Sequence, residues 1–348
     1  MIKVGIAGIG FMGMVHYLSY QKVRGAKVVA LCEKIQKRLD GDWRDIKGNF
    51  GPAGKKMNLK GIATYGDLDD LLADPNIDVV DVCLPPRFHP DVTIRALKAG
   101  KHVFCEKPIA LTAKDARRMV AAAEKAKRIL MIGHVLPMFP EYGKAYQLIQ
   151  SGKYGRLLGG NFKRVISDPL WIPNFFDPAA IGGPMFDLHI HDAHFIRLAC
   201  GMPDSLFTTG RMRGEVVEHF TTQFVYEDSD LAVTVISGVI NQQGRAFTHA
   251  FEIHLERATL LFDFAVIDDK PELLTPFTVL DSKGKVLRPK LGGSGDPLEA
   301  FENELKEVTR AIRSGKASPI LDGQLARDAV VLCQKQTQSL KSGRAVRV

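Results

Sequence analysis

The chain has 348 residues, 45% of them hydrophobic and 25% charged, which is the composition of a folded enzyme of one or two domains. Its formal net charge is +8, but the basic residues are scattered rather than gathered in a stripe, so we do not expect it to bind nucleic acid. No apolar run approaches the length that spans a bilayer, and we expect no membrane partner.

The cysteines are widely spaced and mostly embedded in apolar runs, which argues against a disulfide framework and against a zinc site. Buried free thiols in a reducing compartment are the simplest interpretation. The chain enters a strand at once, with no signal peptide before it, so we predict a cytoplasmic protein without a bound metal. The five cysteines are Cys32, Cys83, Cys105, Cys200 and Cys333.

Residues 1–130 alternate short apolar runs with helical patterns, which predicts a parallel, doubly wound sheet and a dinucleotide-binding domain of the Rossmann type. Asp67 and Thr112 are typical helix N-caps, and residues 41–61 form an irregular segment rich in Gly, Lys and Asn. We expect strands at Lys3–Ala7, Lys27–Cys32, Val79–Leu84, His102–Cys105 and Leu130–Gly133, and helices at Met12–Val23, Asp67–Leu72, His89–Ala99 and Thr112–Lys127.

Residues 131–348 have a different pattern and are predicted to form a second α/β domain for substrate binding and oligomerisation. Between Leu206 and Leu287 the sequence consists mainly of β-type runs separated by polar turns, which is typical of an antiparallel meander. The other predicted elements are a helix at Tyr142–Gln150, a strand at Leu157–Val165, a helix at Met185–Ala199 and closing helices at Pro297–Ser314 and Gly323–Ser342.

A glycine loop of the form G-x-G-x-x-G follows the first predicted strand and opens the first helix. In this motif Gly8 permits the tight turn, Gly10 lets the backbone approach a pyrophosphate, and Gly13 lets helix and strand pack closely. Phe11 and Met12 lie at the start of the helix, whose free N–H groups favour phosphate. The sequence therefore predicts a dinucleotide site.

Glu33 ends the second predicted strand at the distance from the glycine loop where an acid binds the ribose hydroxyls of NAD. A surface glutamate at a strand end is the alternative interpretation. Lys34 follows it and could attract the 2′-phosphate of NADP. We predict NAD as the cofactor, with NADP possible.

Lys107 lies in the segment Glu106-Lys107-Pro108 at the end of a predicted parallel strand, where doubly wound sheets place their ligands. A lysine there can contact cofactor and substrate, and its charge would stabilise a developing alkoxide. A solvated lysine in a strand–helix loop is the alternative from position alone.

Asp187, His191 and His194 are spaced i, i+4 and i+7 on a predicted helix and would share one face. A carboxylate beside an imidazole orients the ring and raises its basicity, which suits general acid–base catalysis. An isolated histidine is usually structural, but several ionisable groups within a few residues are hard to explain by packing. A metal site is disfavoured, because His189 should point away from His191.

Six segments in order along the chain carry a family resemblance. They are Gly8–Gly13, Glu33, the turn Pro85–His89, Gly100–Pro108, the motif Gly182–Asp192 and the closing stretch Phe301–Val346. Together they resemble the glucose–fructose oxidoreductase / inositol dehydrogenase / MocA (Gfo/Idh/MocA) family over essentially the whole chain.

This resemblance implies an N-terminal Rossmann domain and a C-terminal α/β domain with a large, mostly antiparallel sheet, with the last helices packing back toward the first domain. It also implies that Lys107, Asp187 and His191 occupy the family's catalytic positions. The histidine is then the acid–base group, the lysine polarises the reacting oxygen, and the aspartate supports both. The cofactor-facing residues include Pro85, His89, Glu106 and Lys107.

Two departures from the family pattern lie near the expected substrate pocket. Met138 stands where arginine is common, and His194 where an acidic residue is frequent. The identity of the substrate is therefore not carried over. We expect substrate contacts from His134, Arg164, Trp171 and His194.

The resulting expectation is a nicotinamide-dependent oxidoreductase that moves a hydride between NAD(P) and a hydroxyl carbon of a sugar, an inositol or a related polyol. An enzyme that keeps its NAD bound and shuttles hydride internally, for glycoside cleavage or epimerisation, is a second possibility. A non-catalytic NAD-binding sensor on the same fold is a third.

The resemblance also implies that one face of the C-terminal sheet is free of helices. The run Leu231–Val239 has apolar residues at both odd and even positions, as in Ala232 and Val233 and again in Val235 and Ile236, so both faces of this strand are apolar. When both faces of a sheet are apolar, the face without helices must also be covered by another surface. We therefore expect a homodimer or homotetramer that packs through this sheet.

Overall fold

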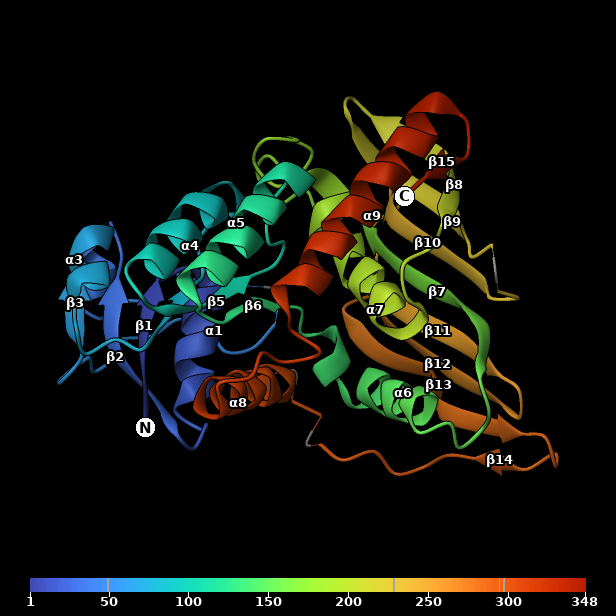
Figure 1. Ribbon diagram of the computed structural model, residues 1–348, viewed down its shortest axis with the longest axis horizontal. Helices are drawn as coiled ribbons and strands as arrows, with labels where there is room; N and C mark the ends of the chain where they lie inside the picture. The colour runs from blue at the N-terminus through green and yellow to red at the C-terminus, as the bar shows by residue number, and fades with distance from the viewer. Residues whose placement is uncertain (49, 228, 294, 297) are drawn as a thin grey trace. The chain divides into compact units, whose positions relative to one another are not determined.

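The computed structural model describes residues 1–48, 50–227, 229–293, 295–296 and 298–348. Contacts within the chain divide it into two units, which are described separately. Unit 1 comprises Met1–Met138 and Gly293–Arg327, and unit 2 comprises Phe139–Gly292 and Asp328–Val348. Figure 1 labels the elements of each unit.

Six strands form the sheet of unit 1: β1 (Ile2–Ala7), β2 (Ala26–Cys32), β3 (Ala63–Tyr65), β4 (Val79–Val82), β5 (His102–Glu106) and β6 (Leu130–Gly133). All neighbouring pairs are parallel, and the order is β3-β2-β1-β4-β5-β6. This confirms the predicted doubly wound Rossmann sheet. The order reverses between β1 and β4, so ligands are expected at the carboxyl ends of these strands.

The helices of unit 1 begin at the predicted caps. Asp67 accepts a hydrogen bond from the Asp69 backbone N–H at the start of α3, and Thr112 accepts one from the Asp115 backbone N–H at the start of α5. The expected start of the closing helix, Pro297, lies outside the described residues. The helices are α1 (Phe11–Tyr20), α2 (Gln36–Leu39), α3 (Leu68–Ala73), α4 (His89–Lys98), α5 (Ala113–Ala126) and α8 (Leu298–Ser314).

Unit 2 contains a nine-stranded sheet of order β14-β13-β12-β11-β7-β10-β9-β8-β15. Its strands are β7 (Leu157–Ser167), β8 (Ser205–Arg213), β9 (Val216–Val225), β10 (Ala232–Ile240), β11 (Arg245–Leu255), β12 (Ala258–Ile267), β13 (Lys270–Asp281), β14 (Val286–Leu287) and β15 (Val346–Arg347). The mostly antiparallel character is confirmed.

The sheet of unit 2 is not a simple meander, because β7 lies between β10 and β11 and pairs parallel with β10. The chain thus enters the sheet at its centre and later strands add on both sides. Nothing in the local pattern of Leu157–Ser167 marks it as a central strand, so the sequence could not show this insertion.

Helices cover one face of this sheet in Figure 1: α6 (Pro140–Gln150), α7 (Ile190–Cys200) and α9 (Gly323–Ser342), which begins in unit 1. Tyr142 of α6 is fully buried and packs edge-on against Phe195 of α7 and Phe251 of β11. On α9, Gln336 bonds to His189 and to Thr222 of β9. These contacts fix the helices to the sheet.

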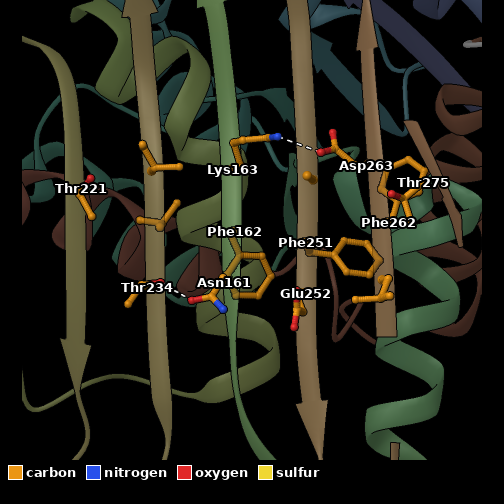
Figure 2. Close-up of a pocket in the computed structure, with 14 residues that line it drawn as sticks. Asn161, Phe162, Lys163, Thr221, Thr234, Phe251, Glu252, Phe262, Asp263 and Thr275 are labelled. Carbon is orange, nitrogen blue, oxygen red and sulfur yellow. Dashed lines mark hydrogen bonds and ion pairs between the residues drawn. The ribbon is translucent and has the colours of Figure 1, made fainter. Parts of the chain in front are cut away.

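The opposite face of the sheet carries a row of side chains that runs from strand to strand. Backbone pairing places Thr221, Ile236, Lys163, Ala250 and Asp263 opposite one another in turn. Figure 2 shows this outer face, with Lys163 bonded to Asp263 at 2.9 Å across a hollow of about 450 Å³. The face is thus more polar than the apolar run in β10 suggested.

All five cysteines of the described chain are free thiols, four of them buried and Cys200 half-buried. Burial raises the pKa of the Cys32 thiol to about 11. Among the described residues, none of the helices is both long enough and apolar enough for a membrane span.

Arg164 of β7 and Asp192 of α7 form an ion pair inside unit 2. Two bonds of 2.5 and 3.2 Å join the groups, whose side chains are 4% and 0% exposed. The Arg164 guanidinium also lies 5.6 Å from the centre of the Phe247 ring. Removing one member would leave the other charge buried without compensation.

We therefore expect Arg164→Ala to lower the free energy of unfolding by about 3–5 kcal/mol. Arg156→Ala is the matched control, since Arg156 bonds to Asp230 and Glu256 with its side chain 61% exposed. Arg156→Ala should lower the free energy of unfolding much less, because solvent screens an exposed ion pair. Denaturant unfolding of both variants measures the difference, and equal losses would contradict the burial argument.

Candidate active site

The glycine loop joins β1 to α1 and is shaped for close approach of a ligand. Gly8 has a φ of +97°, and a Cβ there would lie 2.7 Å from the Cys83 carbonyl oxygen. A Cβ on Gly13 would lie 2.0 Å from the Gly8 oxygen, whereas one on Gly10 would meet nothing within 4 Å. The two outer glycines therefore allow the packing, and Gly10 leaves space for a phosphate.

The start of α1 offers backbone N–H groups to that space. Gly10 is the N-cap and supplies no side-chain cap, and no acidic residue lies in the first turn. Phe11 and Met12 are the first helical residues, and the Phe11 ring packs edge-on against Phe50 at 4.8 Å. Uncapped N–H groups at a helix N-terminus favour an anion.

Glu33 lies directly against the glycine loop. Its carboxylate accepts hydrogen bonds from the backbone N–H groups of Ile9 at 2.9 Å, Lys34 at 2.7 Å and Ile35 at 3.2 Å. The acid is therefore held at the carboxyl end of β2, beside the loop that would carry the pyrophosphate. Lys34 is exposed and forms an ion pair with Asp67.

A cation that sequence reasoning missed, Arg38, lies next to Glu33. Its Nη1 donates to the Ile9 carbonyl at 3.0 Å and lies 3.8 Å from the Glu33 carboxylate, and its Nη2 donates to Asp45 at 3.0 Å. An arginine shortly after the strand-end acid could have been noticed, since such residues accommodate a 2′-phosphate in NADP enzymes. Here two carboxylates already engage it.

The turn after β4 and the turn after β5 are tied together by His89. Its ring nitrogens lie 2.7 Å from the Leu84 carbonyl oxygen and 2.8 Å from the Pro108 carbonyl oxygen. Burial lowers the pKa of His89, and the two carbonyl contacts oppose that shift. His89 thus braces the loops, while Pro85 between them is exposed.

Glu106 and Lys107 follow at the carboxyl end of β5. One oxygen of the buried Glu106 carboxylate accepts from the Lys107 backbone N–H at 3.1 Å, and the other lies 3.1 Å from Nε2 of His16. A Cβ on Gly133 of β6 would come within 2.9 Å of that second oxygen. Glu106 is therefore enclosed, and Lys107 beside it is half-buried.

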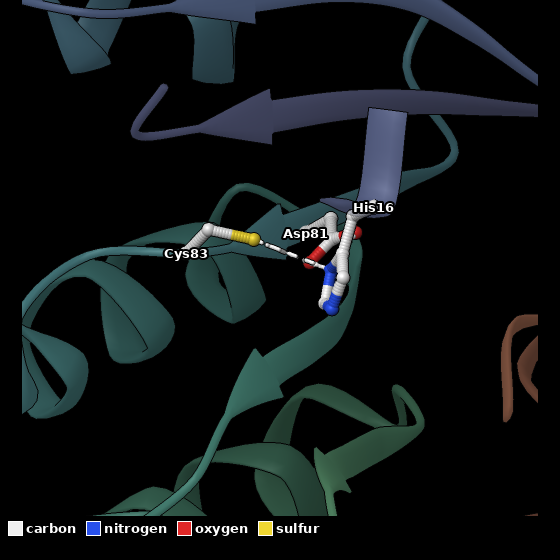
Figure 3. A group of neighbouring side chains, drawn as sticks. All are labelled: His16, Asp81 and Cys83. Atoms are coloured by element: carbon white, nitrogen blue, oxygen red, sulfur yellow. Dashed lines mark hydrogen bonds and ion pairs between the residues drawn. The ribbon is translucent and has the colours of Figure 1, made fainter. Parts of the chain in front are cut away.

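Figure 3 shows a further cluster that sequence reasoning missed, formed by His16 of α1, Asp81 of β4 and Cys83. His16 Nδ1 lies 2.9 Å from Asp81 and 3.3 Å from the Cys83 sulfur. Burial opposes protonation of the ring, but Asp81 and Cys83 outweigh it and raise the pKa of His16 well above its usual value. A charged residue inside the apolar strand Val79–Val82 was the available signal.

In unit 2 the predicted catalytic helix begins with a wider turn than expected. Gly182 and Gly183 take φ angles of +84° and +69°, and residues Met185–His189 then form a π-helical turn before α7. Because a π turn bonds i to i+5, four-residue spacing from Asp187 to His191 does not by itself place them on one face. Both side chains are half-buried.

The remaining predicted residues lie in different surroundings. His194 and His134 are buried, Trp171 is 64% exposed on the segment after β7, and Arg164 is paired with Asp192. Lys107 and His134 belong to unit 1, and the others to unit 2. His189 is a core residue, and burial lowers its pKa to about 4.

Two family models match the chain. One described as "Oxidoreductase family, NAD-binding Rossmann fold" matches residues 2–134, and one described as "GFO/IDH/MocA C-terminal domain" matches residues 142–261. The first matched segment contains the glycine loop and Glu106-Lys107. The second contains the Gly182–His191 motif.

Three known proteins illustrate the similarity. An inositol 2-dehydrogenase/D-chiro-inositol 3-dehydrogenase of Lactiplantibacillus plantarum is 35% identical over 160 residues, which span 45% of this chain and only 42% of that protein. A myo-inositol 2-dehydrogenase of Thermotoga maritima is 26% identical over 365 residues, spanning 100% of this chain and 98% of that protein. Levoglucosan dehydrogenase, solved with NADH and levoglucosan, has a TM-score of 0.79 at 20% identity, covers 100% and 99% of the two chains, and shows the shared fold.

We expect Glu33→Gln to weaken NAD binding about tenfold, the worth of one hydrogen bond to a charged group. NADP binding should weaken less, because the same change removes a negative charge beside Arg38. Lys22→Gln is the control, since Lys22, just beyond the far end of α1, is exposed and paired with Glu302. Titration with both cofactors measures this, and tighter binding of NADP than NAD by the unmodified protein would contradict the assignment.

Proposed function

This chain belongs to the Gfo/Idh/MocA oxidoreductase family and carries its NAD-binding Rossmann domain, and on that premise we propose that it is an NAD-dependent dehydrogenase of a sugar or polyol hydroxyl. The observation that carries the proposal lies in unit 1. Lys107 is held at the carboxyl end of β5, on the same sheet edge as the uncapped start of α1 and Glu33. That edge is where such sheets bind ligands.

The proposed mechanism divides the work between three side chains. Bound NAD would accept the hydride. His191 removes the proton from the substrate hydroxyl, because histidine exchanges a proton near neutral pH. Lys107 stabilises the negative charge that grows on the same oxygen, and Asp187 orients the imidazole or holds a neighbouring hydroxyl. The reverse reduction uses the same groups.

The proposed substrates are polyhydroxylated rings. The named activities of the Lactiplantibacillus and Thermotoga relatives are inositol dehydrogenations, and the levoglucosan enzyme was solved with an anhydrosugar. In this chain Trp171 is the exposed aromatic side chain among the four proposed substrate residues, while His134, Arg164 and His194 are buried. The Arg164 guanidinium is bonded to Asp192, so its proposed role is to support the pocket rather than to bind substrate directly.

Two alternatives differ in what happens to the cofactor. An enzyme that shuttles hydride internally would be purified with NAD absorbance and would not consume added NAD. A sensor would bind NAD without turnover, and the presence of Lys107, Asp187 and His191 disfavours it. A panel of sugars and inositols assayed with both cofactors, together with product analysis and the NAD absorbance of the purified protein, separates all three.

Free cysteines support the proposed location. The described chain holds five free thiols, and persistent thiols are typical of proteins in reducing compartments. The proposed location is the cytoplasm.

The proposed assembly is a homodimer or homotetramer that packs through the outer face of the nine-stranded sheet. That face combines threonine-rich rows with exposed apolar side chains, including Ile236 at 37%, Phe207 at 39% and Leu280 at 36%. A broad sheet face with exposed apolar side chains suits an isologous interface. The partner proposed for it is a second copy of this chain.

Light scattering at micromolar concentration should therefore give a dimer or tetramer mass. Ile236→Lys, which puts a charge in the centre of the outer face, should shift the mass toward the monomer. Leu170→Lys is the control, since Leu170 is 78% exposed on the segment after β7. A monomeric unmodified protein would overturn the proposed assembly.

Lys107→Met and His191→Ala should each lower turnover on the true substrate by roughly 100-fold or more, the usual loss for an acid–base group. Cofactor affinity should change little, because the glycine loop and Glu33 carry it. Lys114→Met and His254→Ala, at exposed or half-exposed positions, are matched controls and should stay within about twofold. Near-normal turnover in both test variants would show that the site is elsewhere.

A further inference from the structure

A carboxyl group without a partner lies in the interior of unit 1. Glu304 of α8 is 0% exposed, and neither of its side-chain oxygens has a hydrogen-bond partner among the described residues. Leaving an ionised carboxylate unsatisfied in the interior is costly. Burial, and next the charge of Glu106, raise the pKa of Glu304 well above its usual value.

The groups around Glu304 include other acids. One oxygen of its carboxylate, one carboxylate oxygen of Glu106 and one ring nitrogen of His16 lie within 4.8 Å of one another. The single positive charge of His16 is already in contact with Asp81 at 2.9 Å and Glu106 at 3.1 Å. Two ionised carboxylates this close repel each other, and one proton removes the repulsion. The titratable groups that face Glu304 are His16 and Tyr20 of α1, Asp81 of β4 and Glu106 of β5.

We propose that Glu304 is a positioning residue that keeps a proton in the folded protein and shares it with Glu106, so that Glu106 holds the backbone of Lys107 in place for the reaction. The proposal rests on the proposed function, in which Lys107 acts on the substrate oxygen. With Glu304 neutral, His16, Asp81, Glu106 and Glu304 together carry one net negative charge instead of two.

Glu106 transmits this arrangement to Lys107. One Glu106 oxygen accepts from the Lys107 backbone N–H, and the other faces His16 and Gly133. A Cβ at position 133 would crowd this second oxygen, so the carboxylate fits here only beside a glycine. His89 holds the next carbonyl along the chain, that of Pro108. The backbone at Lys107 and Pro108 is thus fixed by two hydrogen bonds, one partly buried and one buried.

His16, Glu106 and Glu304 are also a possible set of metal ligands. A bound metal ion and a shared proton require different charges on the two carboxyl groups. A divalent cation between His16, Glu106 and Glu304 would require both carboxylates ionised. The shared proton requires one of them neutral. An amide at position 304 is neutral, as a protonated carboxyl is, and in the proposed arrangement it can donate to Glu106, but it cannot replace a carboxylate ligand. Glu304→Gln therefore separates the cases.

The first arm of the test is stability against pH and needs no substrate. A carboxyl whose folded pKa is raised binds more protons when folded, so its contribution to stability is full below its unfolded value of 4.5 and is lost as the pH rises toward the folded value. The amide in Glu304→Gln does not titrate, so this variant does not lose stability in this way as the pH rises. Its melting temperature relative to the unmodified protein should therefore rise steadily as the pH is increased above about 4.5.

Glu307→Gln, one turn further along α8, is the matched control. Glu307 bonds to Arg310 through both oxygens at 2.7 Å, and its pKa is lowered although burial opposes this. This variant should be less stable than the unmodified protein at neutral pH, and the difference should shrink as the pH falls. Infrared spectroscopy adds a direct readout: a protonated-carboxyl band at neutral pH that Glu304→Gln removes and Glu307→Gln retains.

The second arm is activity on the substrate found by the panel. Glu304→Gln should keep kcat within about threefold, because its amide still donates to Glu106, whereas Glu304→Leu should lower kcat about tenfold with little change in the KM for NAD. If Glu304→Leu does not fold, the pH and infrared arms on Glu304→Gln still decide the proposal.

Three results would each overturn the proposal of a shared proton. They are a melting-temperature difference between Glu304→Gln and the unmodified protein that does not change with pH, an infrared spectrum that Glu304→Gln leaves unchanged, and stoichiometric metal in the purified protein. Failure of every polyol in the panel, with the pH and infrared results as expected, would instead contradict only the proposed function.

Discussion

His16 lies in the interior of unit 1 with Asp81 on one ring nitrogen and Glu106 on the other, and a buried charge cluster of this kind is stable only while each member keeps its partner. The contact joins α1 to β4 and β5. Because Glu106 also accepts from the Lys107 backbone, the position of the proposed catalytic lysine depends on a helix that starts at the cofactor loop. The packing of α1 against the sheet therefore also affects where the proposed catalytic lysine lies.

Helix α1 therefore contributes both to the proposed phosphate site and to the buried acids that contact Lys107. Its first turn presents uncapped N–H groups beside Gly10, and one turn later His16 points inward to the acids of the sheet. Gly13, between them, allows the helix to lie against the Gly8 carbonyl. A side chain at position 13 would push the helix away and disturb both the phosphate site and the His16 contacts.

Local patterns in the sequence were enough for much of this structure. The glycine loop, the caps Asp67 and Thr112 and the alternation of strands and helices are set by residues close in sequence, and the structure and the family match confirm the fold. The pairing of β7 with β10, by contrast, joins segments about 70 residues apart in sequence and leaves no local trace.

The parts of the site that could not be predicted are non-local in the same sense. Glu304, for example, lies near Glu106 although it comes from α8, nearly 200 residues further along the chain. The π turn at Met185–His189 also interrupts the α-helical spacing from which a shared face of Asp187 and His191 was predicted. In each case a tertiary contact or local geometry decides what a side chain can do.

The central claim is that a hydride leaves a substrate carbon and departs with a freely exchanging cofactor. The most direct measurement uses a polyol substrate carrying deuterium on the carbon that bears the reacting hydroxyl, followed by mass spectrometry of the nicotinamide cofactor and the product. The account predicts one deuterium in the released reduced cofactor and none at the oxidised carbon. Deuterium retained in a non-oxidised product, with no labelled cofactor released, would contradict it and point to internal hydride shuttling.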